Sequence, residues 1–420
     1  MKLLRFGYTL LLYLLLPYAV FHLLWRGRRQ PGYLRHIGER FGRYGSKPDQ
    51  PVIWLHAVSV GETRAAVPLV QRLRERYPGH RILITHMTPT GRETGEQLFG
   101  GSVLRCYLPY DYPFAVRRFL RHFRPEVGLL METELWFNLV EACTERGLPL
   151  LLVNARLSEK SARRYRRFSG LTRAALGQLA AVAAQTGEDA RRLEELGALS
   201  PAVMGNLKFD CSPSESMLRL GSELRARFGA DRPLFLAAST REGEEELILD
   251  AVRGAQVPGL LTVIVPRHPQ RFDEVARLLE QRGIPYQRRS SELAVEPQTE
   301  VVLGDSMGEM FAYYATSDVA FIGGSLLPYG GQNLIEACAV GRPVLIGPHT
   351  YNFAEASRLA LQAGAALRVA NGEALAAALN RLFRDEAARE AMSKAGLAFS
   401  RDHRGATERV MSLIEGFIRE

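Results

Sequence analysis

The sequence has few cysteines and none of the residue spacings by which proteins commonly hold a metal. Four cysteines occur among 420 residues, and they are scattered without a CxxC pair. No HExxH motif or Cys/His cluster is present, and no two aspartates stand two residues apart. We therefore expect free thiols in a reducing compartment, with neither a disulfide framework nor a metal site. The cysteines are Cys106, Cys143, Cys211 and Cys338.

Two widespread nucleotide-binding motifs are also absent, the P-loop GxxxxGK(S/T) and the dinucleotide fingerprint GxGxxG. Residues 319–339, VAFIGGSLLPYGGQNLIEACA, carry their glycines in another arrangement. They predict a buried strand over Val319–Ile322, a glycine-rich turn, and a helix that opens at Gln332. Glycine lets the backbone approach a ligand, and the free N–H groups at a helix start favour an anion.

On that helix Asn333 and Glu336 would share a face. An amide and a carboxylate would then stand beside the bound anion. A carboxylate so close to a phosphate is best explained by sugar hydroxyls that need a hydrogen-bond acceptor. The alternative interpretation is a glycine-rich connection followed by a solvated glutamate.

Length and charge divide the chain into two halves. At 420 residues it is too long for one ordinary core and suits two domains of roughly 150 to 200 residues each. The net charge of +9 is uneven, because residues 1–210 carry 31 Lys and Arg against 18 Asp and Glu, whereas the remainder carries 23 against 27. We therefore expect an anionic partner or surface for the first half only.

Residues 1–30 are expected to anchor the chain to a membrane. The run Phe6–Trp25 is nearly all apolar and long enough to cross a bilayer core of about 30 Å. Three arginines follow it directly, so the positive-inside tendency leaves the bulk of the chain cytoplasmic, in agreement with free thiols. Pro17 leaves room for a kinked helix that lies in one leaflet. A cleaved signal peptide is a further alternative, but no small-residue cleavage site follows.

Residues 31–210 alternate predicted strands with predicted helices. Continuous apolar strands separated by helices predict a parallel sheet covered on both faces, with ligands at the carboxyl ends of its strands. The strands are expected over Val52–Ala57, Arg81–His86, Val103–Tyr107, Val127–Met131 and Leu150–Val153. The helices are expected over Thr63–Tyr77, Tyr112–Phe123, Trp136–Arg146 and Lys160–Gln178. The last of these is rich in arginine, which fits either a solvated face or contact with anionic lipid.

Acidic residues stand at two of these strand ends. Glu62 lies on the first turn of a predicted helix, where the helix dipole lowers the pKa of a carboxyl group and burial raises it. The sequence leaves open which effect is larger. Glu132 and Glu134 flank Thr133, so both would point to one face of an extended chain. The alternative interpretations are a glutamate favoured by the dipole alone and a helix cap.

Residues 211–420 repeat the alternation. The segment from Ser239 to Glu244 echoes the opening of the first domain, with a strand, a turn, a glycine, a glutamate and a helix. Arg267, at the end of a strand, suits bidentate contact with phosphate. Arginine, lysine and helix N-termini would then stabilise a phosphate leaving group in place of a cation. Strands are expected over Leu234–Ala238, Leu261–Val265, Val301–Leu303, Val319–Ile322 and Pro343–Ile346, and the last helices are expected to pack back across both domains.

Nine short segments, taken together and in their order along the chain, indicate a protein family. They are WLHAVSVGE (Trp54–Glu62), THMTPTG (Thr85–Gly91), METELW (Met131–Trp136), NARLS (Asn154–Ser158), NLKFD (Asn206–Asp210), VPRHPQRF (Val265–Phe272), GDSMGEM (Gly304–Met310), GGQNLIEA (Gly330–Ala337) and GPHTYNF (Gly347–Phe353). Together they resemble the 3-deoxy-D-manno-octulosonic acid (Kdo) transferases of lipopolysaccharide synthesis. The resemblance runs from the anchor almost to the C-terminus.

The resemblance implies an α/β protein of the GT-B glycosyltransferase fold, with two facing Rossmann-like domains. It also implies transfer of Kdo from CMP-Kdo to a lipid A precursor at the cytoplasmic side of the inner membrane, with inversion of the anomeric configuration. Membrane lipids would be a further partner. No nucleic acid, cofactor or metal is implied.

By position, Glu62 resembles the general base of the family, and Glu132 and Lys208 resemble its transition-state stabilisers. Phe137 stands where the family commonly has proline, and Asn206 where some members have serine. The residues implied to contact CMP are Arg267, His268, Met307, Gly308, Glu309, Asn333, Leu334, Ile335 and Glu336.

Two other functions remain compatible with this pattern. A nucleotide-sugar epimerase or a UDP-dependent lipid glycosyltransferase would share the site of the second domain, and the binding of CMP against UDP separates these enzymes. A membrane-tethered, non-catalytic binder of sugar nucleotides would have lost the base, yet Glu62 is present.

Overall fold

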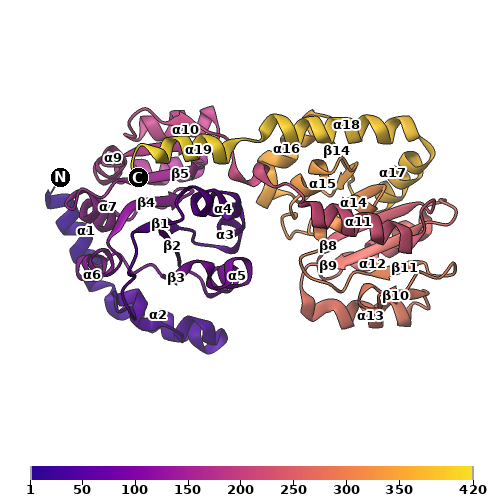
Figure 1. The fold of residues 1–420 in the computed structure, drawn as a ribbon, viewed down its shortest axis with the longest axis horizontal. Coiled ribbons are helices and arrows are strands. Elements are labelled where there is room, and N and C mark those ends of the chain that lie inside the picture. The colour runs from indigo at the N-terminus through magenta and orange to yellow at the C-terminus, as the bar shows by residue number, and fades with distance from the viewer. Residues whose placement is uncertain (1, 419–420) are drawn as a thin grey trace. The chain divides into compact units, whose positions relative to one another are not determined.

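The computed structural model describes residues 2–418, which fold into two α/β units (Figure 1). The first unit comprises the chain up to Asp210 together with the segment from Arg404 onward, and the second comprises Cys211–His403. Each unit contains one seven-stranded sheet whose neighbouring strands pair in parallel. The predicted α/β class with parallel sheets is therefore confirmed.

The sheet of the first unit has the strand order β3-β2-β1-β4-β5-β6-β7. The strands are β1 (Val52–His56), β2 (Arg81–His86), β3 (Leu104–Tyr107), β4 (Pro125–Met131), β5 (Leu150–Ala155), β6 (Ala181–Ala184) and β7 (Ala202–Val203). The helices are α1 (Lys2–Leu14), α2 (Leu16–Arg29), α3 (Val60–Ala65), α4 (Val67–Arg76), α5 (Pro89–Phe99), α6 (Pro113–Phe123), α7 (Phe137–Thr144), α8 (Glu159–Arg166), α9 (Ser169–Gly177), α10 (Gly187–Glu195) and α19 (Ala406–Glu415).

The two faces of this sheet carry separate hydrophobic cores. Side chains alternate along a strand, so Val52 and Trp54 of β1 pack in one core, whereas Ile53 and Leu55 pack in the other. The first core is completed by α6, α7, α9 and α10, and the second by α3, α4 and α19. Because both faces are covered, the strands read as continuous apolar runs.

The sheet of the second unit has the order β10-β11-β9-β8-β12-β13-β14. Its strands are β8 (Leu234–Thr240), β9 (Leu261–Pro266), β10 (Tyr286–Arg288), β11 (Val301–Leu303), β12 (Val319–Ile322), β13 (Val344–Ile346) and β14 (Ala366–Arg368). Its helices are α11 (Glu215–Phe228), α12 (Glu244–Gly254), α13 (Phe272–Gln281), α14 (Met310–Thr316), α15 (Ile335–Ala339), α16 (Ala354–Gln362), α17 (Gly372–Arg384) and α18 (Glu386–His403). One face packs against α12, α13 and α17.

Three predicted helices differ from the structure: two are each divided into two shorter helices, and the third begins later than expected. The helix expected over Thr63–Tyr77 is divided into α3 and α4, because Pro68 in the first turn of α4 cannot donate a backbone hydrogen bond. The helix expected over Lys160–Gln178 is divided into α8 and α9 at Phe168, whose backbone is not helical. The helix expected to open at Gln332 begins only at Ile335, as α15.

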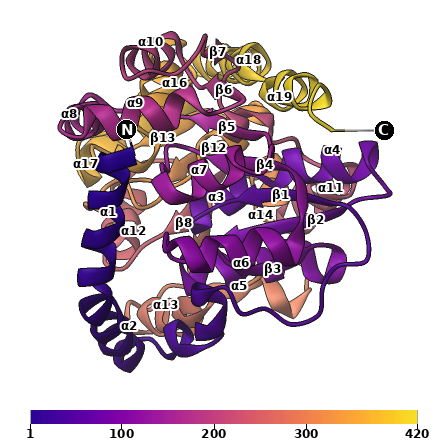
Figure 2. The same ribbon diagram turned by 90° about the vertical axis from the view of Figure 1, so that its left-hand side faces the viewer.

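The apolar N-terminal run is also broken. It forms α1 and α2, which meet at an angle of 48°, with Pro17 in the first turn of α2. Figure 2 shows this bent pair along one side of the first unit. Among residues 2–418, no single helix is long and apolar enough to cross a membrane, whereas α1 and α2 together satisfy the length and composition of a span.

The end of the chain was expected in the domain of residues 211–420, with its last helices packing back across both domains. The segment from Arg404 onward belongs to the first unit, where Val410, Met411 and Ile414 of α19 pack with Leu69 of α4. The amphipathic pattern of α19 predicts a helix with one buried face. It does not identify which sheet covers that face.

Helix α1 is attached to the first unit by polar contacts. The Tyr8 hydroxyl donates to Asp111 over 2.9 Å, Thr9 donates to Asn138 over 3.0 Å, and Arg5 forms an ion pair with Glu141. Asp111 is buried and also accepts the backbone N–H groups of Asn138 and Leu139 in the first turn of α7, at 2.9 and 2.8 Å. This one carboxylate therefore caps α7 and holds α1 against it.

We expect Asp111→Ala to lower the free energy of unfolding of the first unit by about 1–3 kcal/mol, because buried N–H donors and the Tyr8 hydroxyl lose their acceptor. Denaturant titration followed by circular dichroism measures the change. The matched control is Asp49→Ala, since Asp49 is exposed in the same unit. Equal stability of the two variants would contradict the capping role.

Candidate active site

Glu62 and Glu132 lie at the point of the first sheet where the strand order reverses. Strands β1 and β4 are neighbours, but the chain leaves β1 toward β2 on the other side. Ligands of open parallel sheets bind outside the carboxyl ends of strands at such a switch point. Glu62 stands in α3, which follows β1, and Glu132 directly follows β4. The fold thus brings together two acidic residues that are distant in sequence.

The turn before Glu62 is held by hydrogen bonds to its carboxylate. The Val58 N–H donates to Oε2 over 2.7 Å, and the Ser59 hydroxyl donates to Oε1 over 3.0 Å. Ser59 is also the N-cap of α3. The spacing Ser-x-x-Glu is that of a capping box, in which a glutamate three residues into the helix reaches back to the turn.

Burial decides the pKa of Glu62. The residue is 8% exposed, and burial raises the pKa of its carboxyl to about 7, an effect reinforced by the nearby Glu132 carboxylate. The Val58 N–H and the Ser59 hydroxyl act in the opposite direction. Desolvation therefore outweighs the hydrogen bonds that favour the charged form. A carboxylate with this pKa can accept a proton near neutral pH.

Glu132 and Lys208 form an ion pair beside Glu62. Glu132 Oε1 lies 3.6 Å from Lys208 Nζ. Glu132 has a φ of 56°, in the left-handed region that is uncommon for a residue with a long side chain. Such backbone conformations persist where the surrounding structure holds them, frequently at functional sites. The Glu134 side chain is half-buried, and burial raises its pKa.

Two asparagines fix the backbone that carries Lys208. Oδ1 of Asn154, at the carboxyl end of β5, accepts the Leu207 N–H over 3.0 Å, and Oδ1 of Asn206 accepts the Lys208 N–H over 3.0 Å. Asn154 is 1% exposed and has a φ of 52°. The sequence places Asn154 at the end of a predicted strand, but it does not predict this hydrogen bond, because Leu207 lies 53 residues away.

In the second unit the strand order reverses between β8 and β12. The CMP-contact residues implied by the resemblance follow strands on the same carboxyl edge. Arg267 and His268 follow β9, and Met307 to Glu309 follow β11. Asn333 and Leu334 lie in the connection from β12 to α15, and Ile335 and Glu336 lie in the first turn of α15. Oε1 of Gln332, in that connection, accepts a hydrogen bond from Arg267 Nε over 3.2 Å.

The glycine-rich turn after β12 differs from expectation, because a buried glutamate occupies its backbone donors. Glu244 is completely buried and accepts the N–H groups of Gly324, Leu326 and Arg241 at 2.5, 2.9 and 2.9 Å. Burial raises the pKa of Glu244, and these backbone donors oppose the rise. The N–H groups of Gly324 and Leu326 therefore bond a protein carboxylate in this structure.

Asn333 and Glu336 do lie together, although only Glu336 is helical. Asn333 Oδ1 accepts the Ile335 N–H over 3.1 Å, and Asn333 Nδ2 donates to Glu336 Oε1 over 3.0 Å. Leu334 and Ile335 are 1% and 0% exposed, so both residues are buried in this structure.

The remaining implied contacts are accessible. His268 is exposed, Met307 is 57% exposed, and Gly308 has a φ of 83°. Glu309 accepts from Ser306 over 2.6 Å and lies 3.3 Å from Arg289. Among residues 2–418, no three His, Cys, Asp or Glu side chains gather as metal ligands would.

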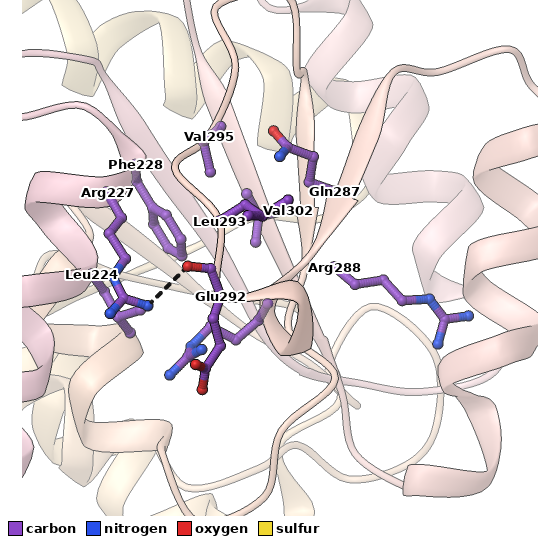
Figure 3. Close-up of a pocket in the computed structure, with 10 residues that line it drawn as sticks. Leu224, Arg227, Phe228, Gln287, Arg288, Glu292, Leu293, Val295 and Val302 are labelled. Carbon is purple, nitrogen blue, oxygen red and sulfur yellow. Dashed lines mark hydrogen bonds between the residues drawn. The ribbon is translucent and has the colours of Figure 1, made fainter.

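Figure 3 shows a separate cavity of the second unit, between α11 and β10. Its volume is about 10 Å³, and it is lined by residues that include Leu224, Phe228 and Val302. The Arg227 guanidinium donates to the Glu292 carbonyl at its edge, over 3.4 Å. Such a volume holds at most one water molecule. This cavity is therefore too small for a nucleotide.

Two Rossmann-like units with acidic or glycine-rich connections at their switch points define the GT-B fold. The fold is similar to a glycosyltransferase from Rickettsia africae, with a TM-score of 0.58 and 14% identity over 89% of this chain and 100% of the other. It is equally similar to the UDP-GlcNAc 2-epimerase of Neisseria meningitidis bound to UDP-GlcNAc, with a TM-score of 0.58 and 15% identity over 87% of this chain and 100% of the other. At these identities the likeness shows the fold alone.

The sequence identifies the family. A model described as 3-deoxy-D-manno-octulosonic-acid transferase matches residues 35–211, and one described as glycosyl transferases group 1 matches residues 283–399. The 3-deoxy-D-manno-octulosonic acid transferase of Bordetella pertussis is 45% identical over 98% of this chain and 99% of its own. The transferase of the same name from Haemophilus influenzae is 39% identical over 99% of both chains. The chain belongs to the Kdo transferase family, which confirms the resemblance of the nine segments.

We expect Glu244→Gln to loosen the turn after β12. An amide offers one acceptor and adds a donor that faces backbone N–H groups, so the variant should lose about 1–3 kcal/mol of stability. Hydrogen exchange at Gly324 and Leu326 should accelerate, as measured by mass spectrometry of proteolytic fragments. Glu246→Gln is the matched control, because Glu246 is exposed on the same helix. Unchanged protection of the Gly324 N–H from hydrogen exchange would contradict the role of Glu244 in holding the turn.

Proposed function

We propose that this protein transfers Kdo from CMP-Kdo to a lipid A precursor, with inversion at the anomeric carbon. The observation that carries the proposal is the Glu62 carboxyl, with a pKa of about 7 at a switch point, beside the Glu132–Lys208 ion pair. Membership of the Kdo transferase family supports the identity of the sugar.

In the proposed reaction, the Glu62 carboxylate takes the proton of an acceptor hydroxyl while that oxygen attacks the anomeric carbon of Kdo. The bond between that carbon and the CMP phosphate oxygen breaks on the opposite face, and the electron pair leaves with the phosphate. A positioned base accounts for about 10²- to 10⁴-fold in rate. Glu132 and Lys208 are assigned to transition-state stabilisation.

The second unit is proposed to bind the nucleotide. Arg267 would contact the phosphate through its guanidinium. Glu336, held by Asn333, would accept hydrogen bonds from the ribose hydroxyls. His268 and the segment from Met307 to Glu309 would complete the site, together with the buried Leu334 and Ile335.

We further propose that the protein lies on the cytoplasmic side of the inner membrane, with α1 and α2 in one leaflet. The exposed apolar residues of α1 recur at helical spacing, at Leu3, Phe6, Leu10 and Leu14. The residues that bond the first unit, Arg5, Tyr8 and Thr9, lie on the other face of the same helix. A helix attached in this way presents one apolar side to the lipid, as an in-plane anchor does.

Incubation of the protein with CMP-Kdo and a lipid A precursor tests the transfer. We expect the acceptor to gain the mass of one or more Kdo residues while CMP is released. Mass spectrometry of the extracted lipid measures the product, and replacement of CMP-Kdo by UDP-GlcNAc is the control. Release of CMP without a heavier lipid, or equal use of both donors, would contradict the proposal.

Glu62→Gln should retain CMP binding and reduce transfer by about 10²- to 10⁴-fold, because glutamine can accept the Val58 N–H but cannot take a proton. In the unaltered protein, kcat/KM should fall tenfold per pH unit below about pH 7 and level off above it, since the base must be deprotonated. Radiolabelled Kdo transfer measured across pH provides both readings.

The control for this variant is Glu75→Gln, an exposed glutamate of the same unit. Near-normal turnover of Glu62→Gln would show that the base is another group. A pH profile of kcat/KM without an inflection near neutral pH would show that the ionisation of Glu62 does not control the reaction.

A further inference from the structure

Arg241 stands at the switch point of the second unit and has no role in the site described so far. It directly follows β8, whose neighbour β12 leads into the glycine-rich turn. Thr240 pairs with Pro266 across the sheet, and the Arg267 N–H donates to the Thr240 carbonyl over 3.0 Å. Arg241 and Arg267 therefore leave two neighbouring strands side by side, at the edge where ligands of such sheets bind.

The glycine-rich turn passes close to both arginines. A Cβ at Gly324 would lie 3.5 Å from Cγ of Arg241 and 3.2 Å from Nε2 of Gln332, the residue that bonds Arg267. Gly324 also has a φ of 69°, which favours glycine. The Arg241 stem and the Gln332 amide thus lie next to the same backbone position.

An aromatic ring holds the Arg241 side chain. Its guanidinium carbon lies 4.6 Å from the centroid of the Tyr329 ring, a cation–π contact. The Tyr329 hydroxyl donates to the Glu242 carbonyl over 3.1 Å, which fixes the ring. Among residues 2–418 the structure gives Arg241 no ion pair, whereas Arg271 is paired with Glu245 at 2.5 Å. A half-buried guanidinium without a carboxylate is suited to an anionic ligand.

The surrounding charges are mainly positive. Burial lowers the pKa of His268, and the charges of Arg267, Arg241 and Arg271 act in the same direction. Of the three carboxylates that directly follow Arg241, Glu242 is exposed, Glu245 binds Arg271, and the oxygens of Glu244 are occupied by backbone N–H groups. The edge of the sheet thus presents two guanidiniums, those of Arg241 and Arg267, to one ligand.

The donor of the proposed function carries two anions at one carbon. In a nucleotide-activated 2-keto sugar acid, the anomeric carbon bears both the phosphate oxygen and the carboxylate. A single guanidinium engages one of them in a bidentate manner. A donor derived from a neutral sugar has no carboxylate at its anomeric carbon, so a guanidinium placed to meet that carboxylate would lack its partner there, which is costly once water is excluded.

We infer that Arg241, held over Tyr329, binds the carboxylate of the sugar acid, while Arg267 binds the phosphate. Arg241 is then a specificity-determining residue that selects nucleotide-activated sugar acids over neutral nucleotide sugars. This inference rests on the proposed function, because it concerns the sugar of the same donor. It assigns no bond-breaking step to Arg241.

The experiment compares two ligands that differ by the sugar acid. Dissociation constants of CMP and CMP-Kdo are measured by calorimetry for the unaltered protein, Arg241→Gln, Arg241→Lys and Arg267→Gln. Arg241→Gln should weaken CMP-Kdo by about 10- to 100-fold and leave CMP within about twofold, since it removes a charged hydrogen-bond pair. Arg241→Lys should recover part of the loss, because it keeps the charge without the planar fork. Arg267→Gln should weaken both ligands.

The matched control is Arg253→Gln, an exposed arginine at the end of α12, which should bind both ligands normally. Equal weakening of CMP and CMP-Kdo by Arg241→Gln would overturn the inference and assign Arg241 to the phosphate. Unchanged binding of both would overturn it as well. Should Arg241→Gln unfold, Arg241→Lys decides by the same comparison. Failure of the unaltered protein to use CMP-Kdo would instead refute the proposed function.

Discussion

The backbone N–H groups at the carboxyl ends of the central strands need acceptors, and buried glutamates meet this need in both units. Glu62 accepts the Val58 N–H in the first unit, and Glu244 accepts three backbone N–H groups in the second. Each stands in the first turn of the helix after the first strand of its sheet. An unpaired buried donor costs about 1–3 kcal/mol, so these carboxylates define the shape of both strand ends.

The same device leaves the two carboxylates with different chemistry. Glu62 has one backbone donor, one hydroxyl donor and the like charge of Glu132 nearby, and burial brings its pKa to about 7. Glu244 is fully enclosed, and its oxygens serve residues on two segments of the chain. A carboxylate that shares a site with another acid is free to exchange a proton, whereas one that ties two loops together is structural.

The sequence predicted the central strands because both faces of each sheet are covered, so their residues are uniformly apolar. It missed β6, β7, β10 and β14; of these, β7 and β10 contain no buried residue and β14 contains one. The equally short β11 and β13 are fully buried and were predicted. Apolar periodicity also did not reveal the division at Pro68 of the helix expected over Thr63–Tyr77. The motifs identified Glu62, Glu132 and Lys208 as residues of one site. The hydrogen bond from the Gly324 N–H to Glu244 was not predictable, since the two residues are 80 positions apart.

Glu244 occupies the Gly324 and Leu326 N–H groups of the glycine-rich turn, so in the proposed function the charge of the donor is recognised by side chains. A backbone cradle reads only the presence of an anion, since its N–H groups are the same for any phosphate. Guanidiniums that follow neighbouring strands have fixed positions and a planar fork, so they select a ligand by the positions of its anionic groups. Arg241 and Arg267, which the pairing of Thr240 with Pro266 brings side by side, are the two residues to which we assign this selectivity. In the proposed function, Glu244 removes backbone donors that would bind any phosphate. The two arginines then favour a donor whose anomeric carbon bears both a phosphate oxygen and a carboxylate.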